Sequence, residues 1–159
     1  MTKELTKELT KNSVVLLVES RGENVALARS MVAALASQMD AITVNELEEL
    51  KVAVSEAVSN CVIHGYKGEP GRQIRISADL LADGILIEIS DEGIGIEDVK
   101  KAMEPSFSTD PERMGLGFAF MQSFSDRLEV ESEKGKGTTV KLFKYIGSKE
   151  LEQAAPCPS

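Results

Sequence analysis

The sequence predicts an α/β two-layer sandwich, in which a mostly antiparallel sheet carries helices on one face. Two pairs of segments alternate apolar and polar residues, and a short turn-forming stretch separates the members of each pair: 73–80 with 85–90, and 127–131 with 138–145. Strands that follow one another this closely form antiparallel hairpins. Helical patterns lie before and between the pairs, which favours helices on one face. A Rossmann-type sheet, with a helix between successive strands, is disfavoured.

The length and composition fit one globular domain. The 159 residues are 42% hydrophobic and 28% charged, which is enough apolar material for a core. We expect a polar segment at 1–12, a single domain at 13–146 and a disordered tail at 147–159. No apolar run approaches the roughly 20 residues needed to cross a bilayer, and the amino terminus lacks the apolar centre of a secretory signal. These features predict a cytoplasmic protein that does not associate with a membrane.

The charge and the cysteine count exclude several kinds of site. A net charge of −8 argues against direct nucleic-acid binding, which calls for a basic surface. Two cysteines and one histidine are too few for a disulfide framework or a structural zinc site. A magnesium ion held by oxygen ligands remains open.

The first two elements follow from apolar patterning. Residues 14–18 are a continuous apolar, β-branched run and predict a buried strand. This strand would either be simply core or, at a sheet edge, form a dimer interface. Residues 25–39 have helical spacing.

The next helix has its own start and stop signals. Thr43 and Glu46 match a capping box, in which each side chain satisfies an amide of the first turn. The helix is expected to run to His64, where Gly65 would supply a left-handed stop.

The remaining elements are short. An Asp83-Gly84 turn is expected to join the first two hairpin strands, and residues 133–137 to join the second pair. Residues 97–103 and 117–124 have helical spacing, and a polar loop with two prolines, 104–114, lies between them.

Glu56, Asn60 and His64 lie on one stripe of the long helix, because residues four apart stand about one turn apart. The apolar residues of this helix occupy a different arc, centred roughly 150° away. Exposed Glu and Asn residues are common on helices, so the stripe alone is weak evidence for a site. A helix-end histidine is commonly satisfied by local hydrogen bonds, with a phosphate contact as the alternative.

Three glycine-containing segments follow downstream: Asp91-Glu92-Gly93-Ile94-Gly95, Gly115-Leu116-Gly117 and Gly137-Thr138-Thr139. An aspartate at a strand end can accept a hydrogen bond from an exocyclic amine, and glycines let the backbone approach a ligand. Glycines that open a helix leave amides to face an anion. Each segment alone is equally explained by an ordinary turn.

The order and spacing of these pieces resemble the Bergerat-type ATP-binding fold shared by gyrase-type topoisomerases, Hsp90-type chaperones, histidine kinases and MutL-type repair proteins. The resemblance spans residues 13–146. Within that superfamily the chain looks most like the small anti-sigma factors with serine/threonine-protein kinase activity, of the sporulation type. The matching segments are Val54–Asn60, Ile63–Tyr66, Asp91–Ile96, Phe107–Thr109 and Met114–Phe118.

The resemblance implies roles for individual residues. Glu56 would be the general base and Arg113, in the lid, would pair with the terminal phosphate. Asn60 would coordinate Mg²⁺ and Asp91 would read the adenine amino group. The remaining positions implied for the nucleotide are Gly93, Gly95, Gly115, Gly117, Thr138 and, in one reading, His64. Arg29, on the first helix, would contact protein partners.

The function implied is that of an ATP-dependent serine kinase and anti-sigma factor, binding ATP or ADP with Mg²⁺. As a homodimer it would sequester an RNA polymerase sigma factor and phosphorylate an anti-anti-sigma factor on serine. One alternative is an ATPase of the same fold, although 159 residues leave no room for transducing domains. Another is a nucleotide-sensing protein-binding module without kinase activity. A histidine-kinase fragment is a further alternative, but no segment resembles a phosphoacceptor hairpin.

Overall fold

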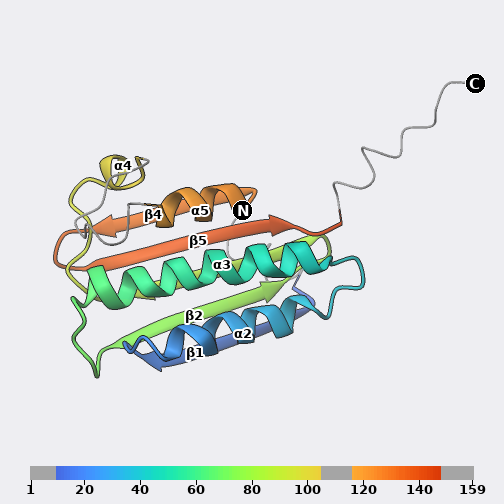
Figure 1. The fold of residues 1–159 in the computed structure, drawn as a ribbon, viewed down its shortest axis with the longest axis horizontal. Coiled ribbons are helices and arrows are strands. Elements are labelled where there is room, and N and C mark those ends of the chain that lie inside the picture. The colour runs from blue at the N-terminus through green and yellow to red at the C-terminus, as the bar shows by residue number, and fades with distance from the viewer. Residues whose placement is uncertain (1–9, 105–115, 148–159) are drawn as a thin grey trace, which may run out of the picture.

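The computed structural model describes residues 10–104 and 116–147, which form one sheet covered by helices (Figure 1). The sheet has five strands in the order β1-β2-β3-β5-β4, and every neighbouring pair is antiparallel. The strands are β1 (Asn12–Glu19), β2 (Gln73–Leu80), β3 (Gly84–Asp91), β4 (Arg127–Glu133) and β5 (Gly137–Tyr145). Both predicted hairpins are confirmed.

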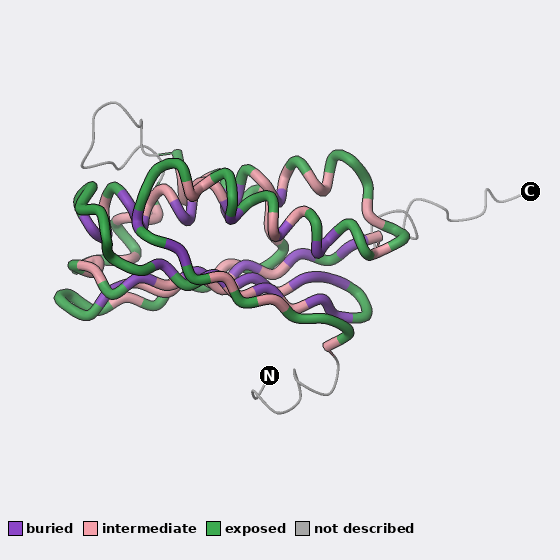
Figure 2. Tube along the Cα trace, turned by 90° about the horizontal axis from the view of Figure 1, so that it is seen from below, coloured by how far each residue is buried: buried purple, intermediate pink, exposed green. Residues whose placement is uncertain are grey.

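The helices cover one face of the sheet, as the sequence predicts (Figures 1 and 2). They are α2 (Asn24–Ala36), α3 (Val44–Asn60), its π-helical continuation η1 (Cys61–Gly65), the short α4 (Val99–Ala102) and α5 (Gly117–Phe124). The α/β two-layer architecture with a mostly antiparallel sheet is therefore confirmed.

The core lies between the helices and the inward face of the sheet. Alternate residues of β2 and β3 are fully buried, namely Ile74, Ile76, Ile85, Ile87 and Ile89. Val32 of α2, with Val54 and Val58 of α3, meets them from the helix layer and is equally buried. Each such side chain contributes about 1.5–3 kcal/mol relative to its exposed state, so this layer fixes the position of α3 over the sheet.

Strand β1 lies at an edge of the sheet and is only partly buried, which corrects the expectation of a fully buried strand at 14–18. Val14, Leu16 and Val18 face the core, but Val15 and Leu17 are 52% and 53% exposed on the opposite face. A strand with helices on one side only buries alternate residues, and the outward residues of β1 happen to be apolar.

The start of α3 agrees with its predicted capping box. The Thr43 hydroxyl accepts a hydrogen bond from the Glu46 amide at 3.1 Å, and the Glu46 carboxylate accepts one from the Thr43 amide at 2.8 Å. These bonds satisfy two amides that a helix start otherwise leaves without partners.

The end of α3 differs from the prediction. After Asn60 the chain widens into η1, in which the Tyr66 amide donates to the Cys61 carbonyl at 2.9 Å. Gly65 does not adopt a positive φ; Lys67 (φ 51°) and Gly68 (φ 75°) do so instead. The left-handed stop at Gly65 is therefore wrong, and the reason for this glycine is given with the site below.

The Asp83-Gly84 turn is also corrected. The chain bends at Ala82 and Asp83, with the Leu81 amide donating to the Gly84 carbonyl at 2.8 Å, and Gly84 already belongs to β3. A Cβ atom at Gly84 would overlap the carbonyl of Lys144 on β5. This glycine is thus needed for the close approach of two strands.

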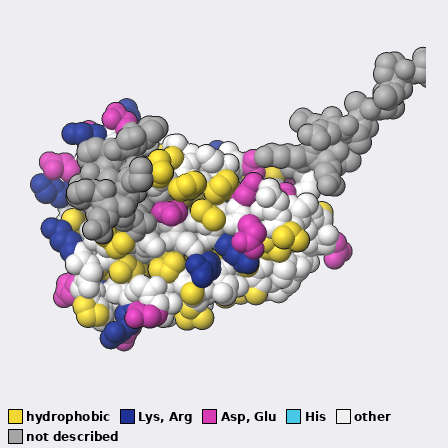
Figure 3. Space-filling view, viewed as in Figure 1, with side chains coloured by type: hydrophobic (Ala, Val, Ile, Leu, Met, Phe, Trp, Pro, Cys, Tyr) yellow, Lys and Arg dark blue, Asp and Glu magenta, His cyan; other side chains and the backbone are white. Residues whose placement is uncertain are grey.

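Among residues 10–104 and 116–147, no helix combines the length and apolarity needed to span a bilayer. The helix-bearing face carries acidic and basic side chains that are mixed with one another, next to scattered hydrophobic ones (Figure 3).

Candidate nucleotide-binding site

Two polar side chains of α3 meet the start of α5. A Cβ atom placed on Gly117 would lie 3.1 Å from Glu56 Oε2 and 3.5 Å and 3.6 Å from the two amide atoms of Asn60. Glu56 and Asn60 are both half-buried. The structure therefore brings three of the predicted site residues together, although 57 positions separate Asn60 from Gly117 in the sequence.

Asp91 occupies the end of β3 on the helix-facing side of the sheet, where it is 7% exposed. A Cβ atom on Gly65 would lie 2.9 Å from the carboxyl atoms of Asp91. Gly65 thus leaves room for this carboxylate beneath η1. Because η1 begins directly after Asn60, the Asp91 carboxylate and the Glu56–Asn60 pair lie on the same side of the sheet, near the same end of α3.

Burial raises the pKa of Asp91 above its usual value. Hydrogen bonds from the Gly93 amide (2.9 Å), the Cys61 thiol and the Thr138 amide oppose this shift, as does the positive charge of Arg72. Burial, followed by the negative charge of Asp91, raises the pKa of the Cys61 thiol well above its ordinary range. Asp91 is thus a desolvated acceptor held by several donors, an environment suited to reading an amine.

Thr138 lies directly opposite Asp91 in the register of β3 and β5, and opposite Ser132 in that of β4 and β5. Ser132 Oγ is 2.8 Å from Thr138 Oγ1 and accepts a hydrogen bond from the Ile96 amide at 2.7 Å. The three side chains form a polar row across the inward face of the sheet.

Gly93 and Gly95 approach other parts of the chain. A Cβ atom on Gly93 would overlap the Gly65 carbonyl, and the Ile94 amide donates to that same oxygen at 3.0 Å. A Cβ atom on Gly95, whose φ is 72°, would overlap the carbonyl of Glu133. Chain packing alone accounts for these glycines, so a role toward a nucleotide stays a prediction.

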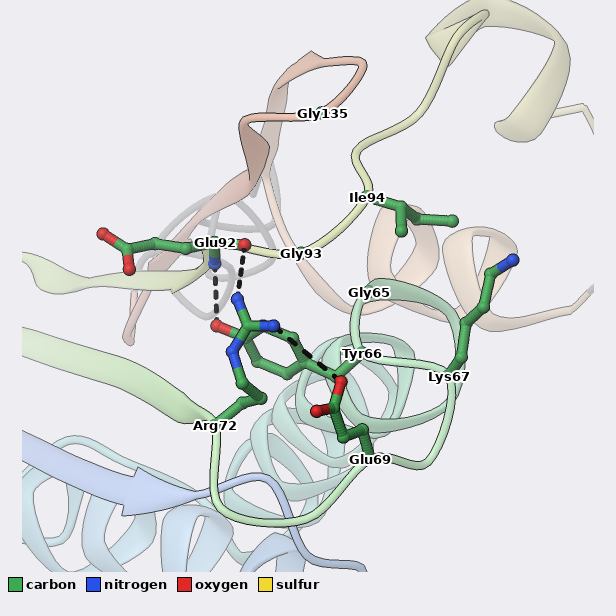
Figure 4. A pocket seen from close by; sticks show the side chains of 9 residues that line it. All are labelled: Gly65, Tyr66, Lys67, Glu69, Arg72, Glu92, Gly93, Ile94 and Gly135. Atoms are coloured by element: carbon green, nitrogen blue, oxygen red, sulfur yellow. Dashed lines mark hydrogen bonds and ion pairs between the residues drawn. The ribbon is translucent and has the colours of Figure 1, made fainter.

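A pocket of about 300 Å³ adjoins the site and shares Gly65 and Gly93 with it (Figure 4). Tyr66 and Arg72 lie on its wall, with the guanidinium 4.8 Å from the centre of the Tyr66 ring. Glu56, Asn60 and Asp91 do not line it. The pocket is therefore a neighbour of the predicted nucleotide site and does not coincide with it.

The oxygen atoms at the site fit a magnesium ion only in company with other ligands. Within residues 10–104 and 116–147, no three His, Cys, Asp or Glu side chains are grouped so that they could hold a metal. The Asn60 amide oxygen is a hard donor of the kind that Mg²⁺ accepts, and this ion usually takes one or two protein ligands with phosphate and water.

The roles expected of four further residues stay predictions: Arg113, Gly115, His64 and Arg29. Arg113 and Gly115, with the matching segment 107–109, fall outside the described residues. His64 is half-buried inside η1, and its phosphate contact stays a prediction. Arg29 is exposed on α2, as both a partner contact and a solvated residue would be.

The sequence did not point to Ser132 or Lys144, and it assigned no role to Tyr66, which lies in the matching segment Ile63–Tyr66. Ser132 and Lys144 continue the inward-facing series of β4 and β5, after Val130 and Leu142 respectively. A polar residue at an inward position of an alternating strand is a signal that could have identified both. Tyr66 follows a helical pattern and carries no such signal.

The chain is similar to known proteins over most of its length. The family model described as the histidine kinase-like ATPase domain matches residues 18–144. The anti-sigma F factor of Thermoanaerobacter sp. (strain X514) is 51% identical over 139 residues, covering 86% of this chain and 96% of that protein. The anti-sigma F factor of Clostridium beijerinckii is 44% identical over 138 residues, again 86% of this chain and 96% of the relative.

Solved structures share the fold at low sequence identity. The RsbU and RsbW domains of a Mycobacterium tuberculosis protein superpose with a TM-score of 0.61 at 16% identity, over 86% of this chain and 32% of that one. A histidine kinase domain from Erythrobacter litoralis gives 0.55 at 17% identity, over 82% of this chain and 63% of that chain. This chain thus spans about a third of the first structure's length and just under two thirds of the second's. The likeness concerns the fold.

Proposed function

Because the chain belongs to the anti-sigma F factors and carries a histidine kinase-like ATPase domain, we propose that it is an ATP-dependent protein kinase and anti-sigma factor. It binds an RNA polymerase sigma factor and holds it inactive. It phosphorylates a small anti-anti-sigma protein on a serine hydroxyl, and that protein otherwise releases the sigma factor. These partners place its action in the cytoplasm.

The observation that carries the proposal is the meeting of Glu56 and Asn60 with Gly117 at the start of α5. It supports a site in which a carboxylate, an amide oxygen and the amides of a helix start face one ligand. The start of a helix favours negative charge, so the phosphates of a nucleotide belong there. The buried Asp91 carboxylate, near the same end of α3, suits the amino group of adenine.

In the transfer step, Glu56 accepts the proton of the attacking serine hydroxyl. The serine oxygen forms a bond to the terminal phosphorus of ATP, the bond to the bridging oxygen breaks, and ADP leaves. Asn60 would hold Mg²⁺, and the bound ion would supply positive charge against the phosphates. Arg113 acts on the terminal phosphate, and Arg29 on α2 contacts the protein partners.

Glu56→Gln tests the kinase assignment. The amide keeps the size and hydrogen-bonding capacity of the side chain but does not accept the proton, so transfer should fall about 10²- to 10⁴-fold. ATP affinity should remain within a few-fold of wild type. The measurement is transfer of ³²P from γ-labelled ATP to candidate anti-anti-sigma proteins, followed by identification of the labelled residue.

Glu48→Gln is the matched control, because Glu48 lies on the same helix in an exposed pair with Lys51. It should phosphorylate at the wild-type rate. Unchanged transfer by Glu56→Gln would remove Glu56 as the base. Nucleotide binding without any labelled partner would favour the alternative, a nucleotide-sensing module or an ATPase without kinase activity.

A further inference from the structure

Tyr66, the residue that follows η1, forms hydrogen bonds next to the turn that contains Asp91. Tyr66 is 4% exposed, and its hydroxyl donates to the Gln73 carbonyl while accepting from the Glu92 amide at 2.8 Å. Both capacities of the hydroxyl are therefore used. The bonds join the end of η1 to the start of β2 and to the residue next to Asp91.

Arg72 binds the backbone carbonyl of Glu92, whose amide is bound by Tyr66 (Figure 4). Its guanidinium donates to the Glu92 carbonyl at 3.1 Å and lies over the ring of Tyr66. The amide and carbonyl of Glu92 are thus both fixed by side chains from the segment after η1. Arg72 also lies 3.9 Å from Glu69, but this pair is exposed and contributes little.

The hydrogen bonds of Tyr66 and Arg72 to Glu92 affect the Asp91 carboxylate through the backbone. Glu92 lies between Asp91 and Gly93, and the Gly93 amide donates to Asp91 Oδ1 at 2.9 Å. A rotation of the Glu92 peptide would move that donor, and with it the oxygen it orients. We propose that Tyr66, assisted by Arg72, is a positioning residue that aims the Asp91 carboxylate at the amino group of the purine. This inference rests on the proposed ATP site and names the group that sets its base preference.

Tyr66→Phe tests the inference, because it keeps the buried ring under Arg72 and removes only the hydroxyl. The ligands are ATP and purine riboside 5′-triphosphate, which lacks the 6-amino group and is otherwise the same. Tyr66→Phe should weaken ATP binding about 3- to 10-fold, the usual range for one misplaced hydrogen bond. The affinity of Tyr66→Phe for purine riboside 5′-triphosphate should stay within twofold of the wild-type value, since this ligand has no amine from which Asp91 could accept.

Three further variants separate a positioning role from general damage to the protein. In an Asp91→Asn background, Tyr66→Phe should change ATP affinity no further, because the aimed carboxylate is already absent. Tyr145→Phe removes a hydroxyl from a 42% exposed tyrosine on β5 and should leave both affinities unchanged. Arg72→Met should act as Tyr66→Phe does, with a smaller loss.

Calorimetric titration with both nucleotides measures these affinities and tests the positioning role. Equal losses of affinity for ATP and for purine riboside 5′-triphosphate, or no loss of affinity for ATP, would overturn the positioning role. Equal wild-type affinity for the two ligands would show that Asp91 does not read the amine, and would overturn it as well. Failure of the wild-type protein to bind ATP would overturn the proposed function itself.

Discussion

Gly65 and Gly117 leave room for the side chains of the proposed site. A Cβ atom on Gly65 would meet Asp91, and one on Gly117 would meet Glu56. A shift of the Asp91 carboxylate by the width of a methyl group would separate it from the donors that orient it. The geometry of the site therefore depends on residues that contribute no functional group of their own.

Asn60→Ala should remove the magnesium-dependent part of nucleotide binding. Loss of one ligand to a charged centre corresponds to about a 10- to 100-fold loss of Mg·ATP affinity. Titration with ATP in the presence of a chelator is the control, since the variant and the wild type should then agree. Equal affinities in magnesium would exclude Asn60 from the ion.

Asp91→Asn should change how stability depends on pH. The pKa of Asp91 is raised in the folded protein, so folding favours its protonated form. Its contribution to stability is complete below the unfolded value of about 3.9 and is lost as pH rises through the folded value. The wild type should therefore gain stability relative to Asp91→Asn as pH falls from neutral toward 4.

Urea unfolding of both proteins across that range measures the difference, in which titrations common to the two cancel. Parallel stability curves would contradict the raised pKa.

At the scale of elements, β1 combines an open backbone edge with exposed apolar side chains. Among the strands of the described residues it pairs with β2 alone, and Val15 and Leu17 lie on the face away from the helices. Exposed edges of this kind are pairing surfaces unless they are protected. The homodimer expected from the sequence would therefore use β1 as its interface.

Leu17→Lys should convert the dimer to a monomer, because a charge at this position opposes burial against a second copy. The side chain is 53% exposed in the single chain, so folding should be retained. Val52→Lys, at a 37% exposed position of α3, is the control and should remain dimeric. Sedimentation equilibrium distinguishes the two masses, and a dimeric Leu17→Lys would place the interface elsewhere.

The elements that local patterns specify could be predicted from the sequence. The capping box of α3 and the alternation of both hairpins depend on neighbouring residues, and these elements are confirmed. The π-helical turn η1 could not be predicted, because 61–65 have an ordinary helical pattern. Its shape follows from contacts with β3, which lies far along the chain.

The sequence supplied the candidate site residues but not the contacts that support them. The resemblance supplied Glu56, Asn60 and Asp91, and the structure places these side chains on one side of the sheet near the end of α3. Tyr66 belongs to a matching segment but was given no role, because its hydroxyl acts on the backbone of Glu92, 26 residues away. Such contacts leave no periodic signal.

At the scale of the whole molecule, a partly buried ion pair connects the helix layer to the sheet. Lys144 of β5 is 5% exposed, and its Nζ lies 2.7 Å from Glu49 Oε2 on α3. It also donates to the Phe124 carbonyl at the end of α5, at 3.3 Å. One side chain thus ties β5 to both helices that form the proposed phosphate end of the site.

Lys144→Met should destabilise the protein by about 3 kcal/mol, because it leaves the Glu49 carboxylate without its buried partner. The double variant Lys144→Met/Glu49→Leu should recover much of that loss. Lys141→Met, which breaks the exposed pair with Glu131 on neighbouring strands, should cost under about 1 kcal/mol. Chemical denaturation gives all three values, and equal losses at both lysines would contradict the partly buried pair.

The position of β5 inside the sheet bears on how the protein is made. As the polypeptide leaves the ribosome, β1, β2 and β3 can pair in turn, but the free edge of β3 must wait for residues 137–145. Until then neither Thr138 nor Lys144 is in place. A nascent or prematurely terminated chain therefore exposes an unpaired strand edge and lacks part of the proposed nucleotide site, so nucleotide capture would mark the molecules whose synthesis is complete.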